Sequence, residues 1–179
     1  MTGLLPLAAG LDYGSTLTNK ASPYDLNIGM RPVDPRVLPV LYRMHEAGIS
    51  LVLASNTRPD QDRRIALQQA GILHLFAVIL ESARLGVAKP AEVFYRLVEA
   101  AAGVPPRQVV FIGNNMKHDV EGPLRYGMQA VLVKQPDSQN PVQDPAKLGP
   151  DDPEMRASSL GVPVIPNLSH LFDVIPLLK

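Results

Sequence analysis

Short apolar runs alternate with segments of helical hydrophobic spacing through most of this chain, and this alternation limits the fold more than any other feature. Six runs have the length and apolar character of strands: Leu7–Leu11, Ile49–Ala54, Phe76–Leu80, Val109–Ile112, Ala130–Val133 and the shorter Val162–Ile165. Strands that alternate with helices form a parallel sheet covered on both faces. The sequence therefore predicts an α/β fold, a doubly wound (Rossmann-like) parallel sheet of about five or six strands.

Helix signals stand between these runs. Asp34 and Pro35 predict a helix start, because Asp can cap a helix and Pro favours its first position, and Gly48 predicts the end of that helix. Further helices are expected from about Pro59 to Ala70, from Lys89-Pro90 onward, from about Asp119 to Tyr126 and from about Ser169 to Leu178.

Residues 135–159 interrupt the alternation. Prolines are spread through this segment and no hydrophobic period is visible, so it is predicted to be a long Pro-rich loop. Loops of this length are often lids or binding loops. Because the segment leaves the carboxyl end of a predicted strand, we expect a partial lid or a docking segment for a protein partner. The length of 179 residues fits a single domain, residues 1–179.

The charge balance argues against some classes of function. Lys plus Arg and Asp plus Glu both number 17, so the chain offers no basic surface for nucleic acid or for a membrane. It has no Cys, and hence no disulfide, thiolate zinc site or cysteine nucleophile. No apolar run approaches the roughly 18 residues of a membrane span, and the N-terminus lacks the charged start of a signal peptide. We therefore expect a cytoplasmic protein.

Polar residues lie at or near the ends of the predicted strands, where parallel sheets bind ligands. The four motifs are Asp12-Tyr13-Gly14-Ser15-Thr16-Leu17-Thr18, Ser55-Asn56, Lys89-Pro90, and Gly113-Asn114-Asn115-Met116-Lys117-His118-Asp119 followed by Glu121-Gly122 and Gly127-Met128. In this order they resemble the motifs of the haloacid dehalogenase (HAD) superfamily. The first is similar to hhhDxDGTL and the last to GDxxxxD…EGA…GM. The resemblance covers roughly residues 7 to 134.

The resemblance implies a Mg²⁺-dependent phosphatase, in which a carboxylate attacks phosphorus and forms an aspartyl-phosphate. Asp12 would be the nucleophile and a metal ligand, and Lys89 would neutralise charge on the phosphoryl group. The catalytic residues so implied are Asp12, Ser55, Lys89 and Asp119. Those implied to bind phosphate are Thr16, Ser55, Asn56 and Lys89. The implied metal ligands are Asp12, Gly14, Asn114 and Asp119.

Each of these residues also has an ordinary structural interpretation. Asp12 fits a turn or a helix cap, and Ser55-Asn56-Thr57 fits a cap for the next helix. Lys89 fits a solvated surface residue, and Asp119 fits the N-cap of the helix that runs to Tyr126.

Two positions depart from the family's motifs. Gly14 stands where the second Asp of the first motif is usual, so that position supplies no general acid or base. Asn114 stands at the first acidic position of the fourth motif and carries no charge. Both changes weaken the expected hold on Mg²⁺, which is bound largely by carboxylates. His118 is a candidate replacement for the acid or base, because histidine titrates near neutral pH.

The spacing of the motifs leaves no room for a separate cap domain between Asp12 and Ser55 or between Ser55 and Lys89. A cap-less site is open, which favours a large phosphorylated substrate and counts against haloacid dehalogenation in an enclosed pocket. Three functions follow: a phosphatase of reduced or specialised activity, a binding or regulatory protein without turnover, or a transferase that carries an acyl or phosphoryl group on Asp12.

Overall fold

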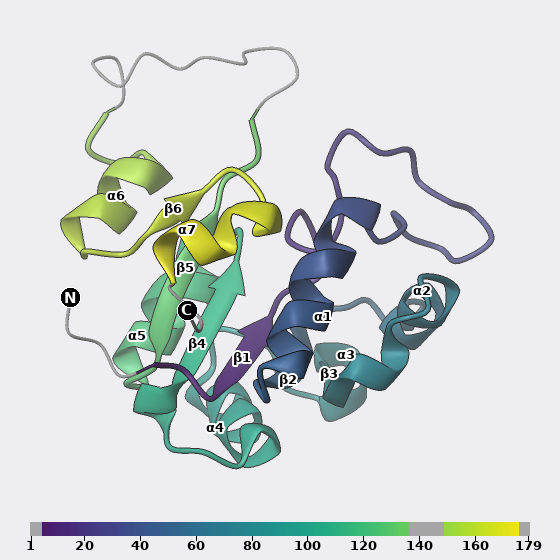
Figure 1. The fold of residues 1–179 in the computed structure, drawn as a ribbon, viewed down its shortest axis with the longest axis horizontal. Helices are drawn as coiled ribbons and strands as arrows, with labels where there is room; N and C mark the ends of the chain where they lie inside the picture. The colour runs from purple at the N-terminus through teal and green to yellow at the C-terminus, as the bar shows by residue number, and fades with distance from the viewer. Residues whose placement is uncertain (1–4, 137–148, 176–179) are drawn as a thin grey trace.

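The structure, a computed structural model, describes residues 5–136 and 149–175 and contains one six-stranded sheet (Figure 1). Every strand pair is parallel and the strand order is β3-β2-β1-β4-β5-β6. The strands are β1 Ala8–Leu11, β2 Ser50–Ser55, β3 Phe76–Glu81, β4 Val109–Gly113, β5 Gln129–Val133 and β6 Val164–Ile165. The predicted α/β fold with a parallel sheet of five or six strands is confirmed.

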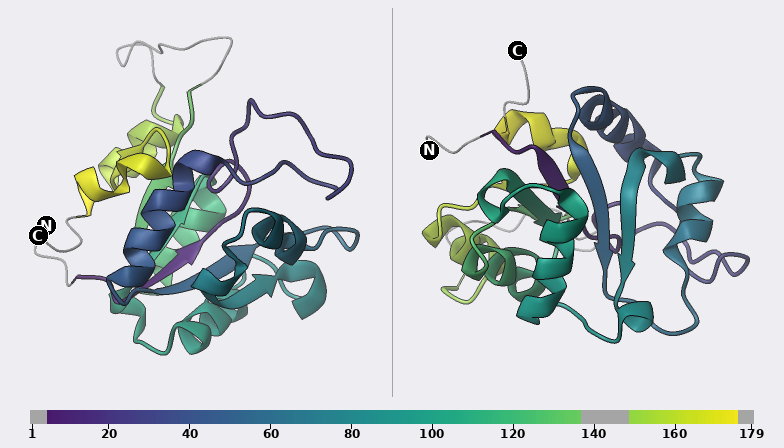
Figure 2. Two further views of the ribbon diagram at one scale, coloured as in Figure 1. Left: turned by 45° about the vertical axis from the view of Figure 1, so that its right-hand side comes forward. Right: turned by 90° about the horizontal axis from the view of Figure 1, so that it is seen from below.

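Helices cover both faces of this sheet (Figure 2). They are α1 Leu38–Glu46, α2 Arg63–Gln69, α3 Ser82–Leu85, α4 Glu92–Ala102, α5 Gly122–Arg125, α6 Pro153–Ser159 and α7 Leu171–Val174. A 3-10 turn, Pro35–Val37, precedes α1, and a π-helical turn, Met116–Glu121, precedes α5.

Two hydrophobic cores, one on each face of the sheet, follow from the alternation of side chains along the strands. Leu11, Leu53 and Ile112 point to the face covered by α1 and α7, whereas Val52 and Phe111 point to the face covered by α4. Gly10 lets Phe111 pack closely, since a Cβ at Gly10 would lie 2.8 Å from the Phe111 ring. The apolar runs of β1, β2, β4 and β5 thus become strands buried on both faces, whereas the edge strand β3 is partly exposed.

The predicted long loop is wrong in its last part. Residues 153–159 form helix α6, in which Asp152 caps the N-terminus by accepting from the Glu154 N–H and Pro153 takes the first helical position. Ala157 anchors the helix in a core under β5. This is the same Asp-Pro signal that predicts the start before α1, but the density of prolines concealed it. Residues 137–148 of the predicted loop lie outside the described residues.

Helix starts also differ from the prediction in three places, one of which is the helix expected from about Asp119, whose π-helical turn begins at Met116. Helix α2 begins at Arg63 and not at Pro59, because the Asp62 side chain accepts from the Arg64 N–H and so caps the helix there. Helix α4 begins at Glu92, after a cis Lys89–Pro90 peptide bond. Helix α3 was not predicted, because its four residues are too short for a hydrophobic period to appear.

Candidate active site

One buried ion cluster joins three of the predicted residues. The Lys89 Nζ donates to Asp12 Oδ1 at 2.9 Å and to Asp119 Oδ1 at 2.7 Å. The exposed fractions are 4% for Lys89, 9% for Asp12 and 1% for Asp119. Residues that are far apart in the chain therefore meet at the carboxyl end of the sheet, as the parallel topology requires.

Neighbouring strands bring the two carboxylates together. Asp12 follows β1 and its N–H donates to the Ile112 carbonyl of β4, while Asp119 lies in the π-helical turn just after β4. The Asn115 N–H donates to Asp119 Oδ2 at 2.9 Å, and the Asn115 side chain caps the turn by accepting from the His118 N–H. Gly113 is needed here, because a Cβ at that position would overlap the Asp119 carboxyl group.

Asn56 holds the backbone of Lys89 from both sides. Its Nδ2 donates to the Lys89 carbonyl at 3.0 Å, and the Lys89 N–H donates to its Oδ1 at 2.9 Å. Both polar atoms of the amide are therefore engaged with the chain. This geometry favours a role for Asn56 in positioning Lys89 over the expected role in binding phosphate.

The charges in the cluster shift one another's pKa values. Burial by itself would lower the pKa of Lys89, but Asp12 and Asp119 more than offset this and raise the pKa above its ordinary range. Burial raises the pKa of Asp119 to about 6, against the lowering effect of Lys89. The Lys89 ammonium group is thus firmly charged, whereas burial brings the pKa of Asp119 close to the neutral range.

Ser55 and Thr16 are both buried near this cluster. The Ser55 Oγ accepts from Arg63 Nε at 3.3 Å and makes a long hydrogen bond of 3.4 Å to the Asn56 carbonyl. The Thr16 hydroxyl makes a similarly long hydrogen bond of 3.5 Å to the Gly14 carbonyl. Two hydroxyl groups in the expected phosphate site therefore have only weak acceptors among the residues that the structure describes.

The two departures from the family's motifs are exposed. Nothing but Asp12 Oδ2, at 3.9 Å, lies within 4 Å of a Cβ built on Gly14. The Asn114 side chain makes no hydrogen bond to the described part of the chain. The neighbouring Ser15 has a φ of 53°, in the left-handed region that favours glycine.

The structural interpretations of these residues are wrong. Asp62, not Ser55 or Asn56, caps α2, and Asn115, not Asp119, caps the turn after β4. Lys89 is buried and not solvated, and Asp12 forms an ion pair with it.

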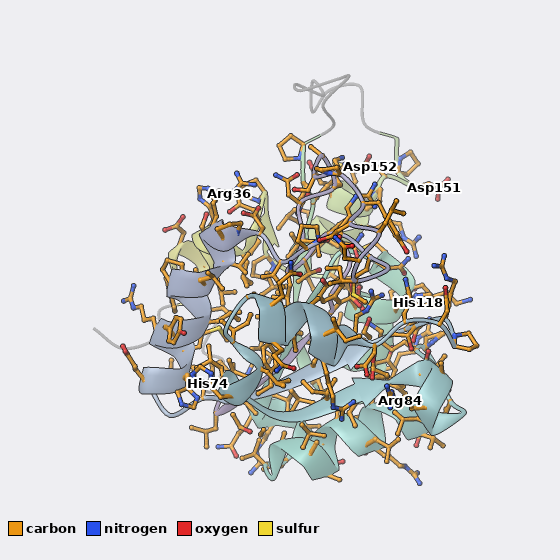
Figure 3. All side chains as sticks on the ribbon, turned by 90° about the vertical axis from the view of Figure 1, so that its right-hand side faces the viewer. Arg36, His74, Arg84, His118, Asp151 and Asp152 are labelled. Carbon is orange, nitrogen blue, oxygen red and sulfur yellow. The ribbon has the colours of Figure 1, made fainter. Side chains whose placement is uncertain are left out.

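His118 is half-buried beside the cluster, and Figure 3 shows its side chain at the edge of the molecule. Burial lowers the pKa of His118, and the nearby charge of Lys89 lowers it further. The imidazole is therefore neutral at pH 7, which suits a proton acceptor better than a proton donor.

Arg63 is the residue that the sequence analysis missed. Its guanidinium is buried, contacts Ser55 and lies over the Tyr13 ring, 4.3 Å from the ring centroid. An Arg-Arg pair at a helix start is ordinarily solvent-exposed, so nothing in the sequence distinguishes Arg63 from Arg64. Only the burial of one of the two identifies it.

The base of the predicted lid lies next to the loop after β1. The Gln135 side chain donates to the carbonyls of Ser15 and Thr18 at 3.0 and 2.7 Å and accepts from the Lys20 N–H at 2.8 Å. The segment beyond β5 thus begins on the same side of the sheet as Asp12.

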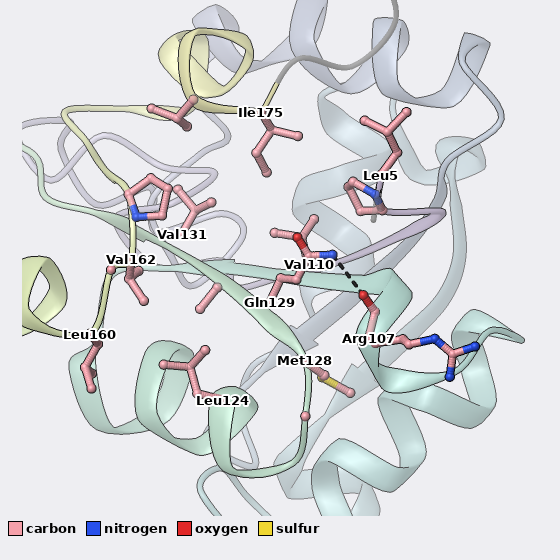
Figure 4. Close-up of a pocket in the computed structure, with 16 residues that line it drawn as sticks. Leu5, Arg107, Val110, Leu124, Met128, Gln129, Val131, Leu160, Val162 and Ile175 are labelled. Carbon is pink, nitrogen blue, oxygen red and sulfur yellow. Dashed lines mark hydrogen bonds between the residues drawn. The ribbon is translucent and has the colours of Figure 1, made fainter. Parts of the chain in front are cut away.

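A separate cavity of about 530 Å³ lies at the opposite edge of the sheet, near the start of β4 and β5 (Figure 4). Its walls are mainly apolar and include Leu5, Val110, Leu124, Val131, Val162 and Ile175. None of the predicted catalytic residues lines it, so it is distinct from the ion cluster.

Residues 5–136 and 149–175 lack two further features. No group of three or more His, Cys, Asp or Glu side chains there is arranged to hold a metal ion. No helix within those ranges is long and apolar enough to cross a membrane.

Comparisons with known proteins agree with this geometry. Residues 10–127 match a family model described as haloacid dehalogenase-like hydrolase. A phosphoserine phosphatase from Thermus thermophilus is 32% identical over 123 residues, which is 69% of this chain and 45% of the relative. A glyceraldehyde 3-phosphate phosphatase from Methanopyrus kandleri is 29% identical over 101 residues, which is 56% of this chain and 42% of the relative.

The matches to both phosphatases span less than half of their length. A crystal structure of an uncharacterized protein from Listeria monocytogenes serotype 4b has a TM-score of 0.69 at 20% identity and covers 97% of this chain and 98% of that one. This likeness extends the shared fold over nearly the whole chain. The motif order, the strand-end cluster and the match over residues 10–127 together place the chain in the haloacid dehalogenase-like hydrolase family.

Proposed function

We propose that this hydrolase is a cap-less, Mg²⁺-dependent phosphatase of reduced or specialised activity that acts through an aspartyl-phosphate on Asp12. The observation that carries the proposal is how the two oxygens of the Asp12 carboxylate are hydrogen-bonded. Lys89 holds its Oδ1, and Oδ2 accepts no hydrogen bond from the described residues. One oxygen is thus fixed by a cation and the other is free to attack. Both curated relatives are phosphatases by name, which favours a phosphorylated substrate.

In the first step, an Asp12 oxygen forms a bond to phosphorus while the bond from phosphorus to the leaving oxygen breaks. Lys89 lies against Asp12 and stabilises the charge on the phosphoryl group, with the Ser55 hydroxyl as a donor to a phosphoryl oxygen. In the second step, water attacks phosphorus, which restores the Asp12 carboxylate and releases phosphate. Departure of an alkyl oxide in the first step and attack by water in the second both need a proton carrier, and Gly14 offers none.

The residues at the site fit Mg²⁺ only modestly. The donors are all oxygen, from the carboxylates of Asp12 and Asp119, the Gly14 carbonyl and the Asn114 amide, and Mg²⁺ needs no more than one or two carboxylates plus water. Lys89 already neutralises part of the carboxylate charge, so weak binding is expected. When bound, the ion would neutralise charge on the transferring phosphoryl group.

A binding or regulatory protein without turnover is the second candidate. The feature that favours it is the loss of both acids, since position 14 carries no side chain and Asn114 is exposed and uncharged. General acid–base catalysis contributes ~10²–10⁴-fold, so a phosphatase without it is slow unless the leaving group is good.

The experiment that separates the two measures Mg²⁺-dependent phosphate release from an aryl phosphate by wild type and by Asp12→Asn. An aryl oxide leaves without protonation, so the assay does not require the missing acid. Turnover that depends on both Mg²⁺ and Asp12 is expected. Equal rates of phosphate release by wild type and Asp12→Asn would refute the phosphatase. The chain would then be a binding protein or an Asp12-dependent transferase. A transferase would be recognised by transfer of the phosphoryl group to an added alcohol.

A further inference from the structure

Arg63 is a buried cation whose guanidinium forms no ion pair with any carboxylate of the described residues. Its Nε donates to Ser55 Oγ at 3.3 Å, and its terminal nitrogens contact Met30 Sδ and Gln61 Oε1, each at 3.3 Å. These acceptors are neutral. The guanidinium lies against the Tyr13 ring, and only 8% of the residue is exposed.

The acid that could have paired with Arg63 is engaged elsewhere. Glu81 accepts from the backbone N–H of Arg63 at 2.7 Å, but its carboxylate forms ion pairs with Arg64 and Arg84 at 3.2 and 2.9 Å. Arg63 itself forms no ion pair with an acid in the described part of the chain. A buried charge without a counter-ion is costly, and an arginine does not lose its proton in proteins.

The charges of the site are balanced when Arg63 is counted. Asp12 and Asp119 contribute two negative charges, and Lys89 and Arg63 contribute two positive ones, all on buried side chains. The cluster therefore lacks the excess of negative charge that would repel a phosphate group. An acid at position 14 or 114 would add negative charge to this site, and neither position carries one.

We propose that Arg63 is a positioning residue for the phosphoryl group and acts through Ser55. Its Nε–H occupies a lone pair of the Ser55 oxygen, so the hydroxyl proton is left to donate outward. The present acceptor of that proton, the Asn56 carbonyl, is 3.4 Å away and is readily replaced by a phosphoryl oxygen. The guanidinium adds positive charge behind the hydroxyl, so the site favours a phosphate dianion even without a metal ion.

Tyr13 keeps the guanidinium in place. Its hydroxyl donates to the Arg31 carbonyl at 2.7 Å, which fixes the ring beneath Arg63. The inference rests on the proposed function only in naming phosphate as the anion; binding of phosphate does not require turnover.

The test is calorimetric titration of the whole protein with inorganic phosphate in the absence of divalent cations. Wild type is compared with Arg63→Met, Arg63→Lys and the control Arg64→Met. The control removes the adjacent charge on the same helix away from Ser55 and leaves Arg84 paired with Glu81. We expect Arg63→Met to weaken phosphate binding roughly 10- to 100-fold, the effect of losing a charge-assisted hydrogen bond. Arg63→Lys should lie between wild type and Arg63→Met, and Arg64→Met should match wild type.

Two further readouts separate positioning from a structural role. Because removal of an unpaired buried charge relieves its desolvation, the melting temperature of Arg63→Met should stay the same or rise. With an aryl phosphate, Arg63→Met should raise KM more than it lowers kcat.

The inference is overturned if wild type binds no phosphate, or if Arg63→Lys and Arg63→Met bind it as tightly as wild type. Arg63→Lys alone decides the matter if Arg63→Met does not fold. Phosphate binding that depends on Arg63 but occurs without turnover would support the role of Arg63 and refute the proposed phosphatase. Turnover that depends on Asp12, with unchanged phosphate affinity in the Arg63 variants, would support the phosphatase and refute the role of Arg63.

Discussion

Gly14→Asp should convert this protein into a faster phosphatase. A Cβ at position 14 meets no atom closer than Asp12 Oδ2 at 3.9 Å, and the backbone φ of Gly14 lies outside the left-handed region, so a side chain fits without strain. The new carboxyl group would lie beside the Asp12 carboxylate. Like charges at that distance raise a pKa, so the added acid would hold a proton closer to neutral pH than a free aspartate does.

The expected gain follows from the role of the missing acid. A positioned general acid or base contributes ~10²–10⁴-fold to a rate, and the whole of this factor should appear for an alkyl phosphate, whose leaving oxygen needs a proton. For an aryl phosphate the gain in the first step should be small, since that oxide leaves unprotonated. The ratio of kcat for alkyl and aryl substrates in Gly14→Asp and wild type therefore measures the effect directly.

Gly14→Asn is the matched control, because it has the same shape and does not exchange a proton. If Gly14→Asp and Gly14→Asn hydrolyse alkyl phosphate at the same rate, the argument that position 14 limits this enzyme is refuted. A second added carboxylate should also tighten Mg²⁺ binding, so the comparison is made at saturating Mg²⁺.

Two other predictions concern the ion cluster. Lys89→Met should lower the unfolding free energy by about 3–5 kcal/mol at pH 7.5, because it leaves the carboxylates of Asp12 and Asp119 buried without their cation. Urea denaturation should show a smaller loss at pH 5, where Asp119 is protonated. An equal loss at both pH values would contradict this account. For wild type, kcat/KM should fall as pH decreases through about 6, since the pKa of Asp119 is raised by burial to about 6 and its carboxylate is ionised only above that value. His118→Gln should keep this acidic limb, and its disappearance in that variant would assign the limb to His118.

Sequence reasoning identified the strands because buried parallel strands are continuous apolar runs, a local property. It did not predict the helix at residues 153–159. An Asp-Pro cap and one buried residue, Ala157, are enough to form this helix because it packs against the core beside β5. The Pro-rich composition predicted a loop here, but most of the stability of a helix comes from packing of its apolar face against the rest of the protein, and composition does not show that packing.

Asp12, Lys89 and Asp119 could be named in advance because their motifs resemble those of the HAD superfamily. That Asp12 and Asp119 lie close together follows from the topology, since the carboxyl ends of parallel strands share one edge of the sheet. The same sequence did not reveal that Asn56 is engaged with the backbone of Lys89, since the hydrogen bonds join segments 33 residues apart. Nor did it separate Arg63 from Arg64. Burial and the pairing of charges are properties of a position in three dimensions, and only the folded chain determines which of two adjacent arginines faces Ser55 and which faces solvent.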